Sequence, residues 1–76
     1  MEATLYAVMI WVSAVTGWDM PASRPDILPM TNEVSARLGG AACASFVPSV
    51  GAHGTIFLGR CAKDEYIVHE VVHFFQ

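Results

Sequence analysis

Charge, and basic charge above all, is what this sequence has least of. Only 14% of its 76 residues are charged, and 4 Lys and Arg stand against 7 Asp and Glu, for a formal net charge of -3. A nucleic-acid-binding protein neutralises phosphates with a basic stripe or patch, and this sequence has none. The 54% of hydrophobic residues excludes a disordered polyelectrolyte as well.

Cysteine is equally scarce. Cys43 and Cys61 permit one internal disulfide at most, and their spacing is not the Cys-x-x-Cys of a zinc ribbon or a redox pair. We expect them to be two small buried hydrophobic side chains in a reducing compartment, which makes a cytoplasmic location the first expectation.

Long hydrophobic runs are also absent. The most apolar segment, residues 3–15, falls short of the roughly 20 residues that a membrane-spanning helix needs. It follows Met1-Glu2 and so lacks the Lys or Arg of a signal peptide, although Val12-Ser13-Ala14 resembles a cleavage site. We expect a core-facing helix here and no membrane association, with the signal peptide of a secreted protein as the alternative.

The length allows one domain, and we expect it to cover residues 1–76, because no repeat or linker is visible. A core of this size rarely stabilises a fold by more than about 3–5 kcal/mol. So small and apolar a chain needs a staple, a partner or more chain. We therefore expect association through its apolar helices, either with a second copy or with a partner chain.

The first half of the chain predicts a helix followed by coil. A helix fits residues 2–16, with Gly17 as its stop signal, and its apolar residues nearly encircle the axis. Such a helix is expected to be deeply buried or to lie at an interface. Three prolines then forbid a continuous helix over residues 18–30, where Ile27-Leu28 predicts a short extended piece.

The second half predicts a short helix, a loop, a strand and a last helix. Thr31 or Asn32 can cap the short helix, which Gly39-Gly40 ends. Residues 41–54 are small and turn-rich, so we expect a loop there. Residues 55–58, Thr-Ile-Phe-Leu between two glycines, then predict a strand. The fold class indicated is α+β.

The last segment, residues 65–76, reads EYIVHEVVHFFQ and contains the pattern His69-Glu70-x-x-His73. Residues four apart on a helix lie one above the other, so both imidazoles can reach one metal ion. Glu70 projects from an adjacent angle. There it could take a proton from a metal-bound water, which zinc makes acidic near neutrality.

A helical reading of this segment separates its apolar and polar residues. At 100° per residue, the Ile, Val and Phe side chains occupy one arc. The other arc holds Tyr66, His69, Glu70, His73 and Gln76. The alternative to a metal site is therefore the polar, solvated face of an ordinary amphipathic helix, since the five-residue pattern also occurs in proteins that bind no metal.

The motif VHEVVHFFQ, preceded by GTIFLG, resembles the metal-binding helix of zincin-type metallopeptidases. More narrowly, the chain is similar to short, uncharacterised bacterial zincin-like proteins. Its matching pieces are Trp11, Thr16-Gly17, Pro21, Pro25, Thr55-Ile56, Leu58 and Val68 through Gln76.

The resemblance implies a small zincin-like domain and a zinc-dependent metallopeptidase that hydrolyses peptide bonds. His69 and His73 would be the zinc (Zn2+) ligands, and Glu70 the general base and later the proton donor. The strand Thr55–Leu58 would correspond to the edge strand along which zincins lay an extended peptide or protein substrate.

The chain departs from the family at the third ligand. Zincins take it from a segment downstream of the second histidine, whereas here only Phe74, Phe75 and Gln76 follow His73. Upstream, we expect His53 to be a flexible surface histidine and Cys61 to be buried. We therefore expect a truncated or split version of a longer fold. The alternative to a peptidase is a truncated or degenerate zincin that acts as a non-catalytic binding or assembly module.

Overall fold

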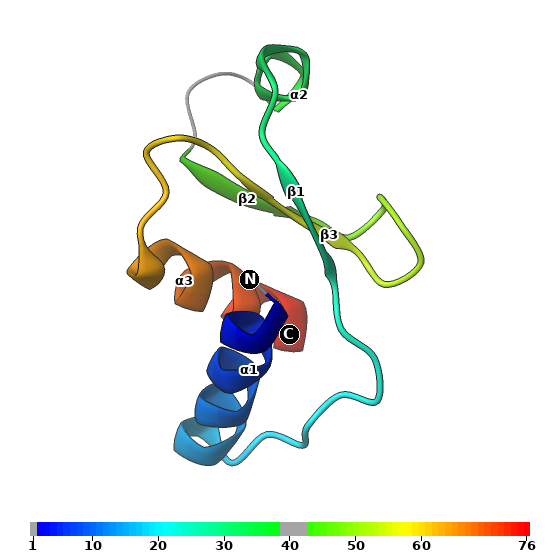
Figure 1. The fold of residues 1–76 in the computed structure, drawn as a ribbon. Coiled ribbons are helices and arrows are strands. Elements are labelled where there is room, and N and C mark those ends of the chain that lie inside the picture. Colours follow the sequence, from blue (N-terminus) through cyan, green and yellow to red (C-terminus); the bar gives the residue numbers. More distant parts are fainter. Residues whose placement is uncertain (1, 39–42) are drawn as a thin grey trace.

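The computed structural model describes residues 2–38 and 43–76, which form three helices and a three-stranded sheet (Figure 1). This is an α+β fold, as the sequence predicts. The elements in chain order are α1 (Glu2–Thr16), β1 (Asp26–Pro29), α2 (Asn32–Arg37), β2 (Ala44–Val47), β3 (Thr55–Leu58) and α3 (Asp64–Phe75).

The sheet has the strand order β1-β3-β2, with β1 parallel and β2 antiparallel to β3. Ile56 of β3 lies between Ile27 on one side and Phe46 on the other. The expectation that Thr55–Leu58 is an edge strand is therefore wrong, because β3 is the central strand. A continuous apolar run buried on both faces is typical of such a strand, and Thr55, Ile56 and Phe57 are all buried.

The edge strand beside β3 is β2, in a region for which the sequence predicts only a loop. Its four residues, Ala-Ser-Phe-Val, are too few to show a clear alternation of apolar and polar side chains. They are also followed directly by Pro48, a residue typical of turns. Pairing with β3, which no local pattern reveals, makes this segment a strand.

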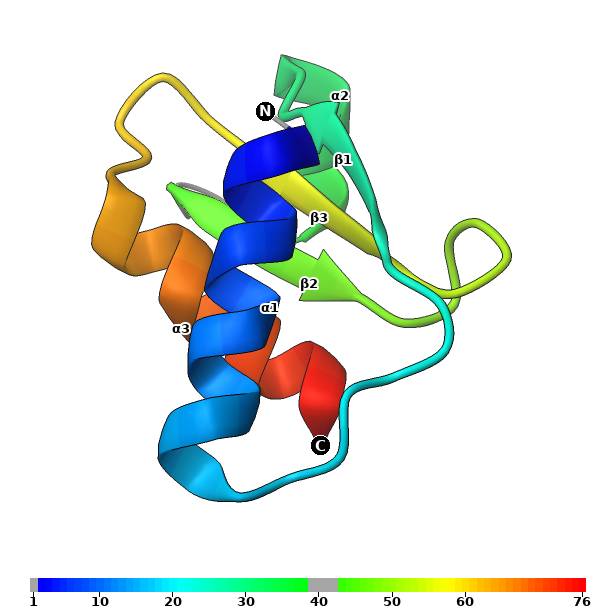
Figure 2. The same ribbon diagram turned by 60° about the horizontal axis from the view of Figure 1, so that its bottom comes forward.

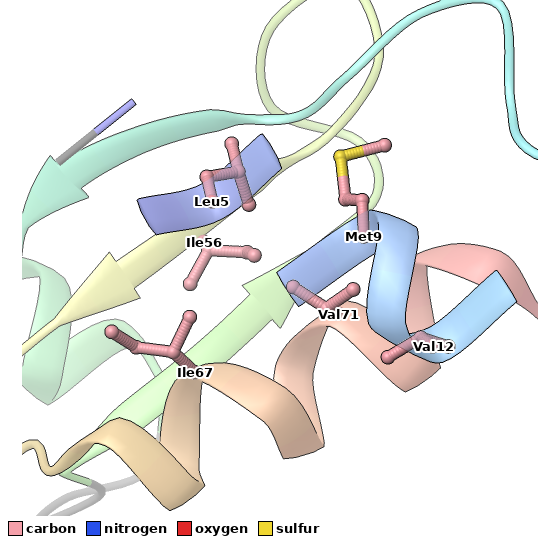
Figure 3. Close-up of a cluster of buried hydrophobic side chains, with 6 residues drawn as sticks. All are labelled: Leu5, Met9, Val12, Ile56, Ile67 and Val71. Atoms are coloured by element: carbon pink, nitrogen blue, oxygen red, sulfur yellow. The ribbon is translucent and has the colours of Figure 1, made fainter. Parts of the chain in front are cut away.

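The core lies where α1 and α3 pack together against one side of the sheet (Figures 1 and 2). Its fully buried apolar side chains come from both helices and from the central strand. They are Leu5, Met9, Val12, Ile56, Ile67 and Val71 (Figure 3). Only one face of α1 contributes, so this helix is not buried all round. Its opposite face is exposed, so the prediction that this helix lies at an interface stays a prediction.

The helix boundaries follow from local chemistry that the sequence displays. α1 ends at Thr16 because Gly17 takes a φ of +76°, and the Gly17 N–H donates to the Ser13 carbonyl at 2.9 Å. Thr31 caps α2, where its hydroxyl accepts a hydrogen bond from the Val34 N–H at 3.2 Å. The stop predicted at Gly39-Gly40 lies outside the described residues. None of the helices described is long and apolar enough to cross a bilayer.

Cys43 and Cys61 form a disulfide with a Cα–Cα distance of 5.1 Å. The expectation of two free, buried thiols is therefore wrong, and Cys61 is exposed. The cause is the antiparallel pairing of β2 with β3. This pairing brings Cys43 beside Gly59, whose N–H donates to the Cys43 carbonyl at 2.7 Å, and Cys61 follows two residues later. The bond joins the start of β2 to the connection that leads into α3.

We expect the disulfide to supply a large share of the stability of this small fold. Closing a loop with a sequence separation of 18 residues restricts the unfolded chain, and the stabilisation expected is roughly 3 kcal/mol. Denaturant unfolding followed by circular dichroism should therefore give a lower free energy for Cys43→Ser, Cys61→Ser than for the oxidised protein. Adding a reductant should lower the denaturant midpoint of the native protein but leave that of the double variant unchanged. Equal midpoints for the two proteins would contradict this prediction.

Candidate metal centre

The helix α3 presents the two histidines because its packing fixes its rotation. Ile67 and Val71 point into the core, which leaves His69 and His73 exposed on another side of the helix. Asp64 and the neighbouring Glu65 lie in the first turn, where negative charge complements the positive end of the helix dipole. The core therefore orients the site, while the site residues themselves contribute little to the packing.

The two imidazoles meet as the sequence spacing predicts. The Nε2 atom of His69 lies 3.1 Å from the Nε2 atom of His73, and the ring centroids are 4.7 Å apart at an angle of 80°. Two nitrogens bound to one tetrahedral zinc at about 2.0–2.1 Å are roughly 3.3 Å apart. The separation of the two nitrogens is therefore close to that of two ligands on one tetrahedral metal ion.

Glu70 completes a group of three possible metal-binding residues. One ligand atom of each of His69, Glu70 and His73 lies within 4.8 Å of the others. Glu70 is only 7% exposed, however, so its side chain does not share the solvated face expected for the polar arc. It lies on the side of α3 that faces β2, and a buried carboxylate beside two exposed imidazoles is not the pattern of an ordinary solvated helix face.

Two hollows flank Glu70, and β2 supplies a wall of each. The larger, of about 620 Å³, is lined by Ser45, Phe46, Pro48, His53, Glu70, His73, Phe74 and Gln76. The smaller, of about 440 Å³, is lined by Cys43, Ala44, Glu65, Tyr66, His69 and Glu70. Glu70 borders both hollows. Together they follow the length of β2 on one side and of α3 on the other.

The larger hollow has an apolar wall whose position depends on one glycine. The rings of Phe46 and Phe74 meet edge to face, with centroids 5.8 Å apart and an interplanar angle of 87°. Gly54 packs directly against Phe46: a Cβ at this position would lie 2.5 Å from Phe46 Cε1. Gly54 also has a φ of +88°, a conformation that favours glycine.

The two upstream candidates for a third ligand, His53 and Cys61, differ in where the structure places them. His53 is exposed, as expected, and borders the larger hollow with Glu70 and His73. It does not belong to the group of ligand atoms that lie within 4.8 Å of one another in the part of the chain that the structure describes. Cys61 is excluded as a ligand because its sulfur is bonded to Cys43.

The part of the site that sequence reasoning missed is the β2 wall. The sequence predicts a loop that includes Ser45 and Phe46, and this prediction does not connect them with Glu70. The one available signal was the pair Phe46-Val47, an aromatic and a β-branched residue of the kind enriched in strands.

We expect the histidine pair to be necessary for metal binding. If these residues bind zinc, the native protein should retain about one ion per chain. His69→Ala, His73→Ala should lose it, with a loss of affinity above the roughly 100-fold that removing an outer hydrogen-bond partner costs. Elemental analysis and Co²⁺ absorption titrations measure this. His53→Ala is the matched control and should bind as tightly as the native chain. An unchanged affinity in the double variant would contradict the assignment.

Comparison with protein-family models, with curated proteins and with solved structures finds no match for this chain. The resemblance to zincins therefore depends on the motif residues alone.

Proposed function

We propose that this chain is a zinc-binding protein of the zincin type that hydrolyses peptide bonds. His69 and His73 hold the metal, and Glu70 moves the proton. The observation that carries the proposal is the Nε2 pair at 3.1 Å, next to a carboxylate that is only 7% exposed.

Zinc, when bound, would polarise the substrate carbonyl and lower the pKa of a water toward neutrality. The protein's own contribution is the proton transfer. A carboxylate oxygen of Glu70 accepts the proton of the attacking water and then donates it to the nitrogen of the leaving amine. Burial between α3 and β2 limits access of bulk water to this carboxylate, which helps to keep the transferred proton in the site.

The edge strand β2 supports a peptide as the substrate. Within residues 2–38 and 43–76, β2 pairs with β3 on one side only, so its other edge can take an extended main chain. The role that the resemblance assigned to Thr55–Leu58 therefore passes to Ala44–Val47 in our proposal. The hollows on either side of Glu70 would hold side chains of the bound peptide.

A non-catalytic module derived from a zincin is the second candidate. It is favoured by the incomplete set of imidazole ligands, because catalytic zinc normally has three protein ligands and one open position. In that case His69 and His73 would hold a metal for stability or assembly, and Glu70 would have no role in proton transfer.

The disulfide supports a compartment that is not reducing as the place of action. Disulfides such as Cys43–Cys61 persist in secreted and periplasmic proteins and are rare in the cytosol. The cytoplasmic expectation depends on free thiols, so we propose instead an exported protein that keeps α1, because Leu5, Met9 and Val12 of this helix are buried in the core.

A single variant separates the two candidates. Glu70→Gln keeps the shape of the side chain but cannot accept a proton, so peptidase activity should fall by about 100- to 10,000-fold while zinc binding persists. Hydrolysis of a quenched fluorescent peptide library by the zinc-loaded protein measures this. Glu33→Gln, an exposed change on α2, is the control and should retain full activity. If the zinc-loaded native chain cleaves no peptide, the peptidase proposal is wrong and the non-catalytic module is the remaining candidate.

A further inference from the structure

Four of the eight exposed large hydrophobic side chains among the described residues lie on α1. Tyr6 is 55% exposed, Trp11 55% and Val15 63%, and Ile10 lies beside them. No charged residue occurs in the sequence between Ala3 and Thr16. A contiguous apolar surface of this kind on a small protein marks an interaction site.

This face has a regular arrangement on the helix. Side chains four residues apart form ridges, and the exposed face consists of two neighbouring ridges. The first ridge is Tyr6, Ile10 and Ala14, and the second is Ala7, Trp11 and Val15, all of them exposed. The ridges point away from Leu5, Met9 and Val12, which are buried on the opposite side of the helix.

The two ridges are related to each other by a reversal of chain direction. About a midpoint between Ile10 and Trp11, Tyr6 corresponds to Val15, and Ala7 corresponds to Ala14. A two-fold axis through that midpoint would bring a second α1 against the first in the antiparallel direction. At the two ends, large side chains would then meet small ones, with Tyr6 over Ala14 and Val15 over Ala7 of the other copy, and the alanines would let the helices approach closely.

We infer that α1 is the interface of a two-fold symmetric homodimer, in which the exposed ridges of two antiparallel α1 helices pack against each other. A second copy of this chain can cover the face without charge repulsion, since the face carries no charged residue. Antiparallel helices also place opposite ends of their dipoles together, whereas a parallel pair would place like ends together.

The available area is consistent with this occupant. Complete burial of the exposed parts of the six ridge residues would remove roughly 600 Å² per chain, so the ridges alone give an interface of at most about 1,200 Å², the lower limit for specific complexes. A hollow of about 550 Å³ beside Trp11, lined by Thr4, Ala7, Val8, Trp11 and Val68, extends the contact toward α3. The two-fold operation brings the end of the other α1 that carries Val15 to this hollow.

The first test is the oligomeric state, which does not depend on zinc or on catalysis. Sedimentation velocity of the oxidised chain should show a concentration-dependent dimer, and Ile10→Glu should raise the dissociation constant at least 100-fold. Val50→Glu places the same charge on another exposed apolar residue, in the β2–β3 connection, and should leave the dimer intact. Circular dichroism verifies that both variants fold, which their exposed positions favour.

The second test is the direction of the helices. With a rise of 1.5 Å per residue, two copies of residue 10 lie about 1.5 Å apart along the axis, and two copies of residue 15 lie about 14 Å apart. Mild oxidation should therefore link Ile10→Cys into a covalent dimer, whereas Val15→Cys should remain unlinked. In a parallel pair both variants would be linked equally.

Several results would overturn the inference. A native chain that stays monomeric at the highest concentration excludes the dimer. A dimer that survives Ile10→Glu but is lost in Val50→Glu places the interface elsewhere. A monomer that floats with neutral phosphatidylcholine vesicles assigns the face to a lipid surface instead. Equal linking of Ile10→Cys and Val15→Cys excludes the antiparallel arrangement.

Discussion

The contact of α3 with the core is the constraint on which the rest of this structure depends. Ile67 and Val71 meet Ile56 of the central strand and the buried face of α1. Burying side chains of this kind contributes about 1.5–3 kcal/mol each, more than any exposed polar contact in the molecule. The resulting rotation of α3 turns Glu70 toward β2 and leaves His69 and His73 outside. The geometry of the candidate site is thus a consequence of apolar packing on a neighbouring face of the same helix.

Local patterns were sufficient for much of the fold and for the centre of the site. Gly17 and Thr31 mark helix ends through their own conformation and hydrogen bonding, and the spacing of His69 and His73 brings their rings together in any regular helix. The features that the sequence does not predict depend on contacts between segments that are distant in the sequence. The strand β2 and the Cys43–Cys61 bond arise from the antiparallel pairing of β2 with β3, and this pairing together with the parallel pairing of β1 makes β3 the central strand. No short stretch of sequence encodes these pairings.

Two features can compensate for the small size of the domain, the disulfide and the exposed face of α1. The disulfide ties the start of β2 to the chain just before α3, so the two walls around Glu70 are joined covalently near one end. The far face of α1 remains apolar and exposed, and our proposed dimer would cover it. If the proposed dimer forms, this 76-residue chain combines an internal disulfide with association, the two remedies that its composition calls for.

Gly54 has a consequence for how this sequence can change. Its φ of +88° and its contact with Phe46 leave no space for a side chain, so any replacement must displace the aromatic ring toward the hollow that Glu70 and His73 border. A residue without a side chain therefore determines the shape of the cavity. Gly54 thus constrains the wall of the cavity, although it offers no side-chain chemistry of its own.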